Sequence, residues 1–459
     1  MELSEFILEH ENDDLAALVL RRDRWPDVDV ALAAECIASR RKLRLKVPQW
    51  YADPALICPV ALSAEQCSST ATASYKAAVA ADGWTVRELS EGQCPDLRPL
   101  AGQGRALCPS RSALCGERPM RIADLTGGLG VDCWQFSKVA GTVLYNEMNP
   151  VLFEAAKINL PRLECNNVEF SNIRISPETL PELLDSFQPD LVFADPARRA
   201  QGGKKVFLPE DCSPDMLALQ DIILDRGIRL MLKLSPMADI SLLLRKFHCV
   251  KELHIVQSDG ECKELLLLQE PGFDGECTVS AVVAEPSNNS SIKVHHLDFH
   301  PAEEKASPAT YISSPPSPGQ YLFEPGPALS KAGAFKLLSS RFGLLKLGPS
   351  AHLYIGDFSG KIRENVASGA EGLQPEGVFG EWFEILDVAP FGKASIHDFA
   401  TRWPCSAVSA RALPLSSDEL SAKLTSLRKK PASGQIHIFG IGTSAGRLLI
   451  ACRPLKHLF

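Results

Sequence analysis

Short apolar runs alternate with stretches of helical spacing from residue 120 onward. Five of these runs are rich in Val, Ile, Leu and Phe and have the length of buried strands; they cover residues 121–127, 141–147, 168–173, 190–196 and 228–236. Each is followed by a stretch with the apolar spacing of an amphipathic helix; these stretches cover 132–140, 149–163, 177–187, 215–227 and 239–247. The pattern predicts five consecutive strand–helix units.

Two further apolar runs, 250–258 and 262–270, follow these units and are joined by the short turn "DGE". They predict a terminal antiparallel hairpin. Repeated strand–helix units predict a mostly parallel sheet covered by helices on both faces, and right-handed crossovers make such a sheet doubly wound. The expected fold class is α/β, with ligands bound at the carboxyl ends of the strands.

The segments on either side of this core have different patterns. Residues 1–118 predict a helical region, with helices over 4–22 (Ser4 as N-cap), 27–46 and 63–83 (closed by Gly83) and a connector at 92–118. A Pro/Ser-rich linker is expected at 301–319, and small α+β regions at 320–390 and 391–459. With the core at 119–300, these ranges are our predicted domains.

The composition excludes several classes of protein. Hydrophobic residues make up 45 % and charged residues 23 % of the 459 residues, as in globular proteins. No Cys-x-x-Cys pair occurs among the 14 cysteines, so we expect no zinc ribbon and no metal. The acidic, amphipathic start is not a signal peptide, and no apolar run could span a bilayer. We expect a reduced cytoplasmic protein.

The first strand–helix turn, "ADLTGGLGVD", contains the first candidate site. Gly128 and Gly130 fit a dinucleotide-binding G-x-G-x-x-G pattern, but the third position is Cys133, which disfavours a dehydrogenase. An acid four residues before G-x-G, here Asp124, is instead the layout of class I methyltransferases, which bind S-adenosylmethionine. A buried acid needs a partner, either the Gly-rich backbone or the amino group of the cofactor.

The next two strands end in further candidate cofactor residues. Glu147 ends the second strand, where a carboxylate can accept hydrogen bonds from both ribose hydroxyls; the alternative is a solvated strand-end acid. Asn172 ends the third strand, where such folds often contact adenine; a turn Asn is the equal alternative.

The fourth strand ends in "ADPARRA". It aligns with the (Asp/Asn)-Pro-Pro-aromatic motif of amino-directed methyltransferases, in which the acid or amide orients a weakly nucleophilic nitrogen. Asp195 and Pro196 are present, but Ala197 replaces the second Pro and Arg198 replaces the aromatic residue. Arg198 and Arg199 could hold a base or a phosphate, or one of them could pair with Asp195.

The fifth strand ends in "MLKLSPMADI". Lys233 interrupts its apolar run and either snorkels at the edge of the sheet or faces the site, where it would contact the substrate. Asp239 is expected to cap the next helix.

Several stretches together resemble the bacterial class I methyltransferases with a C-terminal THUMP-like domain. The resemblance rests on "PQWYADPALICP", "LSAEQCSSTATASYKA", "ADLTGGLGVD", "DPARR", "KLSPMADI" and "HIVQSDGECKELLLL". Beyond residue 319, "YLFEPGPALSKAGAFKLLSSRFGLLKLGPSAHLY" resembles the ferredoxin-like domain of that family. "AVSARALPLSSDELSAKL" and "GQIHIFGIGTSAGRLLIACRP" resemble its THUMP-like module.

The resemblance implies a Rossmann-like core that uses S-adenosylmethionine. The cofactor contacts that it implies are Asp124, Gly128, Gly130 and Glu147, and it implies Asp195 and Pro196 at the methyl acceptor. Our further candidate cofactor contacts are Thr126, Asn172 and Gln66. Gln66 belongs to "EQCSS", which would form a lid or, alternatively, a helix cap. We also expect Arg198 to act with Asp195 and Pro196 in catalysis, and Arg199, Lys233 and Arg411 to contact the substrate.

THUMP modules bind structured RNA, so the implied partner is tRNA or rRNA. Arg411 and Pro414 remain of an expected Arg-Asn-Phe-Pro-like stretch, but its Asn and Phe are absent. The net charge is −8, yet residues 398–459 contain nine Lys/Arg and three acids. The basic run between residues 40 and 46 is either a second RNA contact or a solvated helix face.

We therefore expect a methyltransferase that acts on a base nitrogen of RNA. The alternatives are methylation of a protein or a small molecule, which the missing aromatic after Pro196 favours, and a non-catalytic RNA-binding protein with a relict cofactor site.

Overall fold

The computed structural model describes residues 2–81, 118–198, 209–286, 292–356, 377–428 and 433–455. The chain divides into two compact units. The first contains residues 1–259 and 263–296, and the second contains residues 260–262 and 297–459. Each unit is built around its own sheet.

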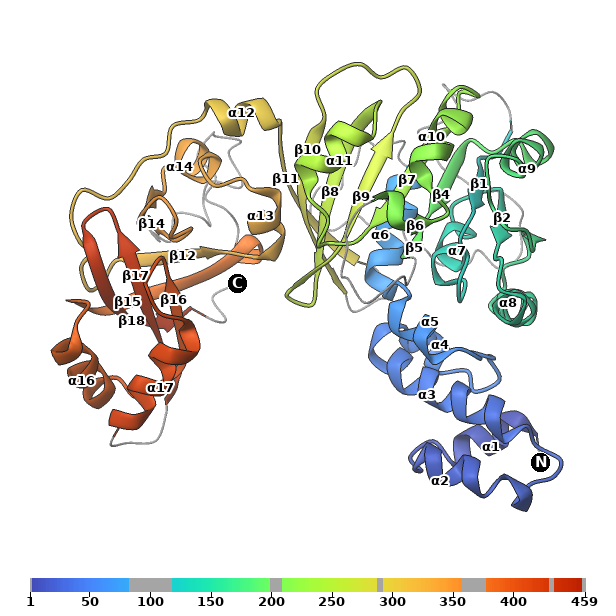
Figure 1. Cartoon of the computed structure of the whole chain (residues 1–459), viewed down its shortest axis with the longest axis horizontal. Coiled ribbons are helices and arrows are strands. Elements are labelled where there is room, and N and C mark those ends of the chain that lie inside the picture. Colours follow the sequence, from blue (N-terminus) through green and yellow to red (C-terminus); the bar gives the residue numbers. More distant parts are fainter. Residues whose placement is uncertain are drawn as a thin grey trace. The chain divides into compact units, whose positions relative to one another are not determined.

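The sheet of the first unit confirms the predicted α/β class (Figure 1). Its nine described strands lie in the order β11-β10-β8-β9-β7-β4-β1-β2-β3. They are β1 Arg121–Asp124, β2 Thr142–Asn146, β3 Val168–Ser171, β4 Leu191–Ala194, β7 Arg229–Leu234, β8 Val250–Ser258, β9 Glu261–Gln269, β10 Thr278–Pro286 and β11 Ile292–Phe299. β1, β2, β3, β4 and β7 are parallel, and β9 is antiparallel to β7. The two strands of the predicted hairpin, β8 and β9, are neighbours in the sheet. β10 and β11 extend the sheet beyond the strands that the sequence predicted.

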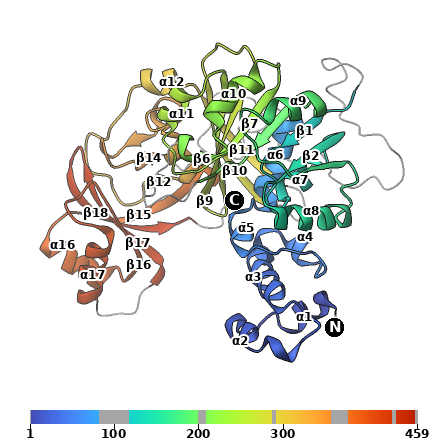
Figure 2. The same ribbon diagram turned by 45° about the vertical axis from the view of Figure 1, so that its right-hand side comes forward.

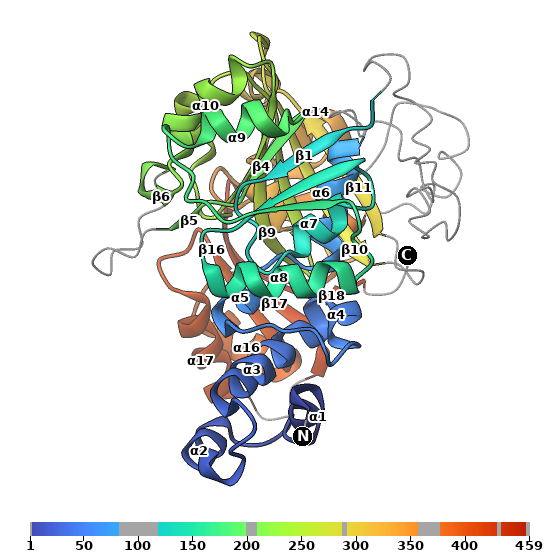
Figure 3. The same ribbon diagram turned by 90° about the vertical axis from the view of Figure 1, so that its right-hand side faces the viewer.

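Helices cover both faces of the parallel strands. Figure 3 shows α7 and α8 on one side of β1, β2 and β4, and α9 and α10 on the other. The bounds are α7 Val131–Phe136, α8 Pro150–Arg162, α9 Leu180–Phe187, α10 Met216–Leu224 and α11 Ile240–Lys246. Asp239 caps α11, because its carboxylate accepts a hydrogen bond from Leu242 N at 2.9 Å. The core between these layers is apolar and includes Tyr145 and Phe193, both buried.

The N-terminal helices differ in detail from the prediction (Figure 2). Residues 4–22 form two helices, because Asp14 caps a new one; Ser4 lies inside α1, whose N-cap is Glu2. The predicted helix at 63–83 is broken at 67–69, and Gly83 lies outside the described residues. The helices are α1 Leu3–Glu9, α2 Leu15–Leu20, α3 Val30–Lys46, α4 Pro48–Tyr51, α5 Ala61–Gln66 and α6 Thr70–Ala81. α6 packs against α7, β8 and β10.

The second unit contains one continuous seven-stranded sheet, in the order β13-β14-β12-β15-β18-β17-β16. The strands are β12 Tyr321–Pro325, β13 Leu345–Lys346, β14 Tyr354–Gly356, β15 Gly380–Pro390, β16 Cys405–Arg411, β17 Ser433–Thr443 and β18 Gly446–Pro454. Its helices are α12 Pro301–Ala306, α13 Pro327–Ala332, α14 Leu337–Phe342, α16 Lys393–Arg402 and α17 Ser417–Leu427. β15 pairs with both β12 and β18, so the regions predicted at 320–390 and 391–459 share a sheet.

Candidate functional site

The first candidate feature is the tight turn between β1 and α7. Gly128 (φ 54°) and Gly130 (φ 93°) have left-handed backbone conformations, which favour glycine. A Cβ at Gly127 would come within 2.1 Å of the Tyr145 ring. The Tyr145 hydroxyl donates a hydrogen bond to the carbonyl of Gly128 at 2.6 Å. The turn therefore packs tightly on β2 and leaves no room for a side chain at Gly127, whereas Gly128 and Gly130 are required by their backbone conformation.

Asp124, at the end of β1, is a buried acid with one unused oxygen. Its Oδ1 accepts a hydrogen bond from Thr126 N at 3.1 Å. Its Oδ2 is buried and has no hydrogen-bond partner among the described residues. Burial raises the pKa of this carboxyl well above its usual range, and the nearby acids Asp132, Glu147 and Asp195 raise it further. A ligand with a positive charge or an N–H group would pair with Oδ2 and would also stabilise the ionised carboxylate.

Glu147 lies directly beside the same turn. Its Oε2 accepts a hydrogen bond from Gly128 N at 2.9 Å, and its Oε1 accepts one from Asn149 N at 2.7 Å. The Asn172 side chain donates to the carbonyl of Glu147 at 2.5 Å. Asn146, which sequence reasoning missed, donates to the carbonyl of Leu125 at 3.0 Å. The backbone thus fixes a half-buried carboxylate whose remaining lone pairs can still accept hydroxyl donors.

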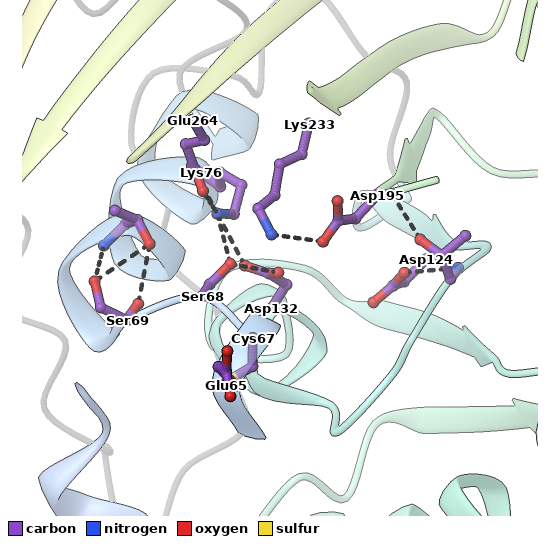
Figure 4. Close-up of polar contacts among 12 residues, drawn as sticks. Glu65, Cys67, Ser68, Ser69, Lys76, Asp124, Asp132, Asp195, Lys233 and Glu264 are labelled. Atoms are coloured by element: carbon purple, nitrogen blue, oxygen red, sulfur yellow. Dashed lines mark hydrogen bonds and ion pairs between the residues drawn. The ribbon is translucent and has the colours of Figure 1, made fainter. Parts of the chain in front are cut away.

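Thr126 joins this turn to the end of β4. While its N–H binds Asp124, its hydroxyl oxygen accepts a hydrogen bond from the backbone N–H of Asp195 at 2.6 Å. Figure 4 shows Asp124 and Asp195 with the hydrogen bonds that join them to this residue. The predicted cofactor acid and the predicted acceptor acid are therefore held within one hydrogen-bonded unit.

Asp195 forms an ion pair with Lys233, from the end of β7. The distance between Lys233 Nζ and Asp195 Oδ2 is 2.5 Å (Figure 4). Burial by itself would lower the pKa of Lys233, but the carboxylates of Asp195, Glu264 and Asp132 outweigh it and raise the pKa above its usual range. Lys233 thus faces the site as a cation. It is the positively charged partner of Asp195, a role that the sequence also allowed for Arg198 or Arg199.

The remaining residues of the fourth-strand motif are less defined. Pro196 is buried. Arg198 lies in the two-residue strand β5 (Ala197–Arg198), which pairs with β6 (Cys212–Ser213), but its side chain is outside the described part of the structure. Arg199 also lies outside the described residues. Their predicted contacts with a base or a phosphate stay predictions.

A second group of buried polar residues adjoins the site, and we call it the α6 network: Ser68, Lys76, Asp132 and Glu264 (Figure 4). Sequence reasoning considered only Ser68, as part of a lid. The available signals were Lys76 within the Ala-rich helix and Glu264 within the apolar run "KELLLL". In the same loop Ser69 Oγ accepts a hydrogen bond from Thr72 N at 3.2 Å, and Gln66 is exposed at the end of α5.

Most of the basic run at residues 40–46 binds nearby protein groups. Arg40 donates to the carbonyls of Tyr51 and Asp53, and Arg41 donates to those of Glu11 and Asp13. Lys42 and Lys46 both contact Glu65. These contacts weaken the interpretation of this run as an RNA contact. Arg411 lies in the second unit and binds Glu324 at 3.0 Å.

No helix in the described ranges is long and apolar enough to cross a membrane. In the same ranges, no cluster of three His, Cys, Asp or Glu side chains could hold a metal ion.

Comparison with known proteins relates the fold of this chain to that of a methyltransferase-like structure. A solved structure described as a "putative methyltransferase from Porphyromonas gingivalis W83" matches with a TM-score of 0.73 and 27 % sequence identity. The match covers 99 % of this chain and 98 % of the other. The chain has a methyltransferase-like fold. A family model described as a ferredoxin-like domain matches residues 321–359, and no curated protein sequence matches the chain.

Other solved structures match a smaller share of the chain. A structure described as "a putative methyltransferase from streptococcus mutans in complex with SAH" has 14 % identity, a TM-score of 0.24, and coverage of 33 % of this chain and 88 % of its own. An rRNA methylase of Streptococcus thermophilus has 17 % identity, a TM-score of 0.24, and coverage of 33 % and 87 %. At these TM-scores neither match carries an argument.

Proposed function

We propose that this protein is an S-adenosylmethionine-dependent methyltransferase that acts on a base nitrogen of a structured RNA, a tRNA or an rRNA. The observation that carries the proposal is Asp124, a buried carboxylate with an unpaired oxygen beside a glycine turn and next to Glu147. The whole-length similarity to a methyltransferase-like structure supports it.

The residues present fit the cofactor. S-adenosylmethionine has an amino group, a sulfonium cation and two ribose hydroxyls, and the site provides oxygen acceptors and negative charge. Asp124 Oδ2 would accept from the amino group, and the remaining lone pairs of Glu147 would accept from the ribose. Gly128 and Gly130 would allow the ligand to approach the backbone closely. When bound, the cofactor supplies the methyl group.

Asp195 would bind the methyl acceptor. Its carboxylate is part of the same hydrogen-bonded unit as Asp124, and it is partly exposed, with 37 % of the side chain accessible. If an N–H of the acceptor donates a hydrogen bond to Asp195, Asp195 would orient the acceptor nitrogen toward the cofactor. Such positioning lowers the barrier without a covalent intermediate.

The RNA part of the proposal rests on the fourth-strand motif and the basic tail. Of the nine cations in that tail, Arg402, Arg411 and Arg453 form ion pairs with acids. Lys423, Arg428 and Arg447 have no ion-pair partner among the described residues, and they are the candidates for phosphate contacts. A protein or small-molecule acceptor is the alternative.

Transfer of a labelled methyl group tests the proposal. Incubation with tritiated S-adenosylmethionine and total RNA is expected to label the RNA, and nucleoside mass spectrometry would then name the product. Asp195→Ala should abolish labelling but leave cofactor affinity within about threefold, because Asp195 does not contact the cofactor in this account. Normal labelling by the variant would show that Asp195 does not hold the acceptor.

A further inference from the structure

Helix α6 comes from the N-terminal helical region, but it is buried in the methyltransferase-like core. Residues 71–80 are all buried, and the helix contacts α7, β8 and β10. The Tyr75 hydroxyl forms a hydrogen bond with His254 Nδ1 at 2.8 Å. The next residue, Lys76, extends toward the candidate site (Figure 4). α6 is therefore an internal element of this unit.

Lys76 is a fully buried cation with a complete set of partners. Its side chain has no accessible surface. Its Nζ lies 2.8 and 2.9 Å from the two carboxylate oxygens of Glu264 and 2.9 Å from Ser68 Oγ. It also lies 3.2 Å from Asp132 Oδ1, while Ser68 donates to Asp132 Oδ2 at 2.8 Å. A charge at this depth is tolerated only because it is paired and hydrogen-bonded.

The ionised form of Glu264 depends on nearby cations. Burial raises the pKa of Glu264, while Lys76 and Lys233 lower it. If Lys76 were absent, burial would be opposed only by the more distant Lys233, and Glu264 would take up a proton more readily. Glu264 and Asp132 favour the charged form of Lys233, whose ammonium group is paired with Asp195. Charges of opposite sign therefore alternate from α6 to Asp195.

We propose that α6 completes the site: Lys76 is a positioning residue that fixes the carboxylates of Glu264 and Asp132. The negative charge of these carboxylates supports the ion pair of Lys233 with Asp195, at the end of β7, the strand that pairs with the β9 of Glu264. The inference rests on the proposed function for the role of Asp195. It follows that the N-terminal helices and the core form one functional unit. Asp195 is then controlled from a helix that the sequence places more than a hundred residues away.

Other titratable groups surround the network and must be considered in any test. They are Lys46 and Cys67 near Lys233, Asp124 near Asp132, Lys263 near Lys46, and His254 on β8. The test therefore depends on differences between variants that share these groups.

The first experiment measures urea unfolding of the full chain between pH 5 and pH 8. In Lys76→Met the folded-state pKa of Glu264 should rise further above its unfolded value. A raised carboxyl pKa costs stability as pH rises above the unfolded-state value, and the cost is complete once pH exceeds the raised value. The urea midpoint should therefore fall at pH 8 by roughly twice as much as at pH 5, and Lys76→Arg should restore much of it.

Two variants make this result specific. Lys76→Met/Glu264→Gln removes the unpaired acid and should lose most of the extra pH dependence. Lys157→Met, an exposed lysine on α8, should behave as the wild type at both pH values. An equal loss of midpoint at pH 5 and pH 8 in Lys76→Met, unchanged in the double variant, would overturn the proposal.

The second experiment measures acetylation of Lys233 by mass spectrometry, with Lys157 as the internal reference. Glu264→Gln removes one anion that favours the charged form of Lys233, so more of its amine should be neutral and reactive. Lys233 should then react about tenfold faster relative to Lys157, which corresponds to a fall of about one unit in the pKa of Lys233. An unchanged ratio would contradict the second half of the proposal. Neither experiment requires the cofactor, so a protein that fails to bind S-adenosylmethionine would refute the proposed function alone.

Discussion

At the scale of single residues, Asp124 combines a stability cost with a binding role. Its carboxyl is buried, has an unpaired oxygen and lies among other acids, so its pKa is raised. Each unit of such a rise costs about 1.4 kcal/mol once the group is ionised. That cost grows as pH rises from the unfolded-state pKa to the raised one, because over this range the folded state keeps a proton that the unfolded chain has already lost.

This predicts the effect of Asp124→Asn on stability and binding. The variant should unfold at higher temperature than the wild type above neutral pH, and the difference should shrink at lower pH. Its affinity for S-adenosylmethionine should fall by about tenfold or more, because a charged acceptor is lost. In the wild type the affinity for S-adenosylmethionine should increase with pH, because binding requires Asp124 to lose its proton. Calorimetry in buffers of different ionisation enthalpy would measure the release of this proton. If Asp124→Asn binds S-adenosylmethionine as tightly as the wild type, Asp124 does not contact the cofactor.

Lys233 gives a second prediction at this scale. Lys233→Met should reduce labelled-methyl transfer by roughly 10-fold or more, because Asp195 loses the cation that orients it. Cofactor affinity, measured by calorimetry, should change by less than about threefold. Lys233→Arg keeps the charge and should retain more transfer. If both substitutions reduce transfer equally and also prevent folding, Lys233 has only a structural role.

The acids Asp124, Glu147 and Asp195 could be found from sequence because each ends an apolar strand. The α6 network could not, because Lys76 and Glu264 are 188 residues apart and meet only in the folded chain. The partner of Asp195 was equally hidden, since Lys233 comes from another strand 38 residues away.

At the scale of elements, the turn between β1 and α7 depends on a side chain from β2. Gly127→Ala would place a methyl group within 2.1 Å of the Tyr145 ring, which is buried and cannot move away. We expect a destabilisation of about 1–3 kcal/mol and loss of cofactor binding, measured by urea unfolding and calorimetry. Gly392→Ala is the control, because a Cβ added at Gly392 would have no other atom within 4 Å. Equal behaviour of the two variants would contradict the close packing of this turn.

Elements with a strong local pattern were predicted best. All five strand–helix units and the hairpin were found, because burial of a parallel strand produces a continuous apolar run. The break between α5 and α6 was missed, because the Ser and Thr residues there fit either a helix or a cap. β10 pairs with β8, and β11 lies next to β10, so the sheet continues beyond the predicted hairpin. No short sequence motif predicts this pairing.

At the scale of the whole molecule, the proposed RNA substrate rests on few free cations. We expect Lys423→Glu/Arg428→Glu to weaken retention of total RNA on filters and to reduce the salt dependence of binding by about two phosphate contacts. The control Lys157→Glu/Arg226→Glu changes the same charge at exposed, ion-paired positions of the first unit. If the control weakens retention as much as the tail variant, the tail has no specific role.

The central claim is that the site built on Asp124, Gly128 and Glu147 binds S-adenosylmethionine. Calorimetric titration of the full chain with S-adenosylmethionine and with S-adenosylhomocysteine tests it most directly. We predict one site per chain with micromolar affinity, roughly −8 kcal/mol, that is lost or strongly weakened in Asp124→Ala. Absence of binding heat at high protein concentration, or equal binding by Asp124→Ala, would contradict the account.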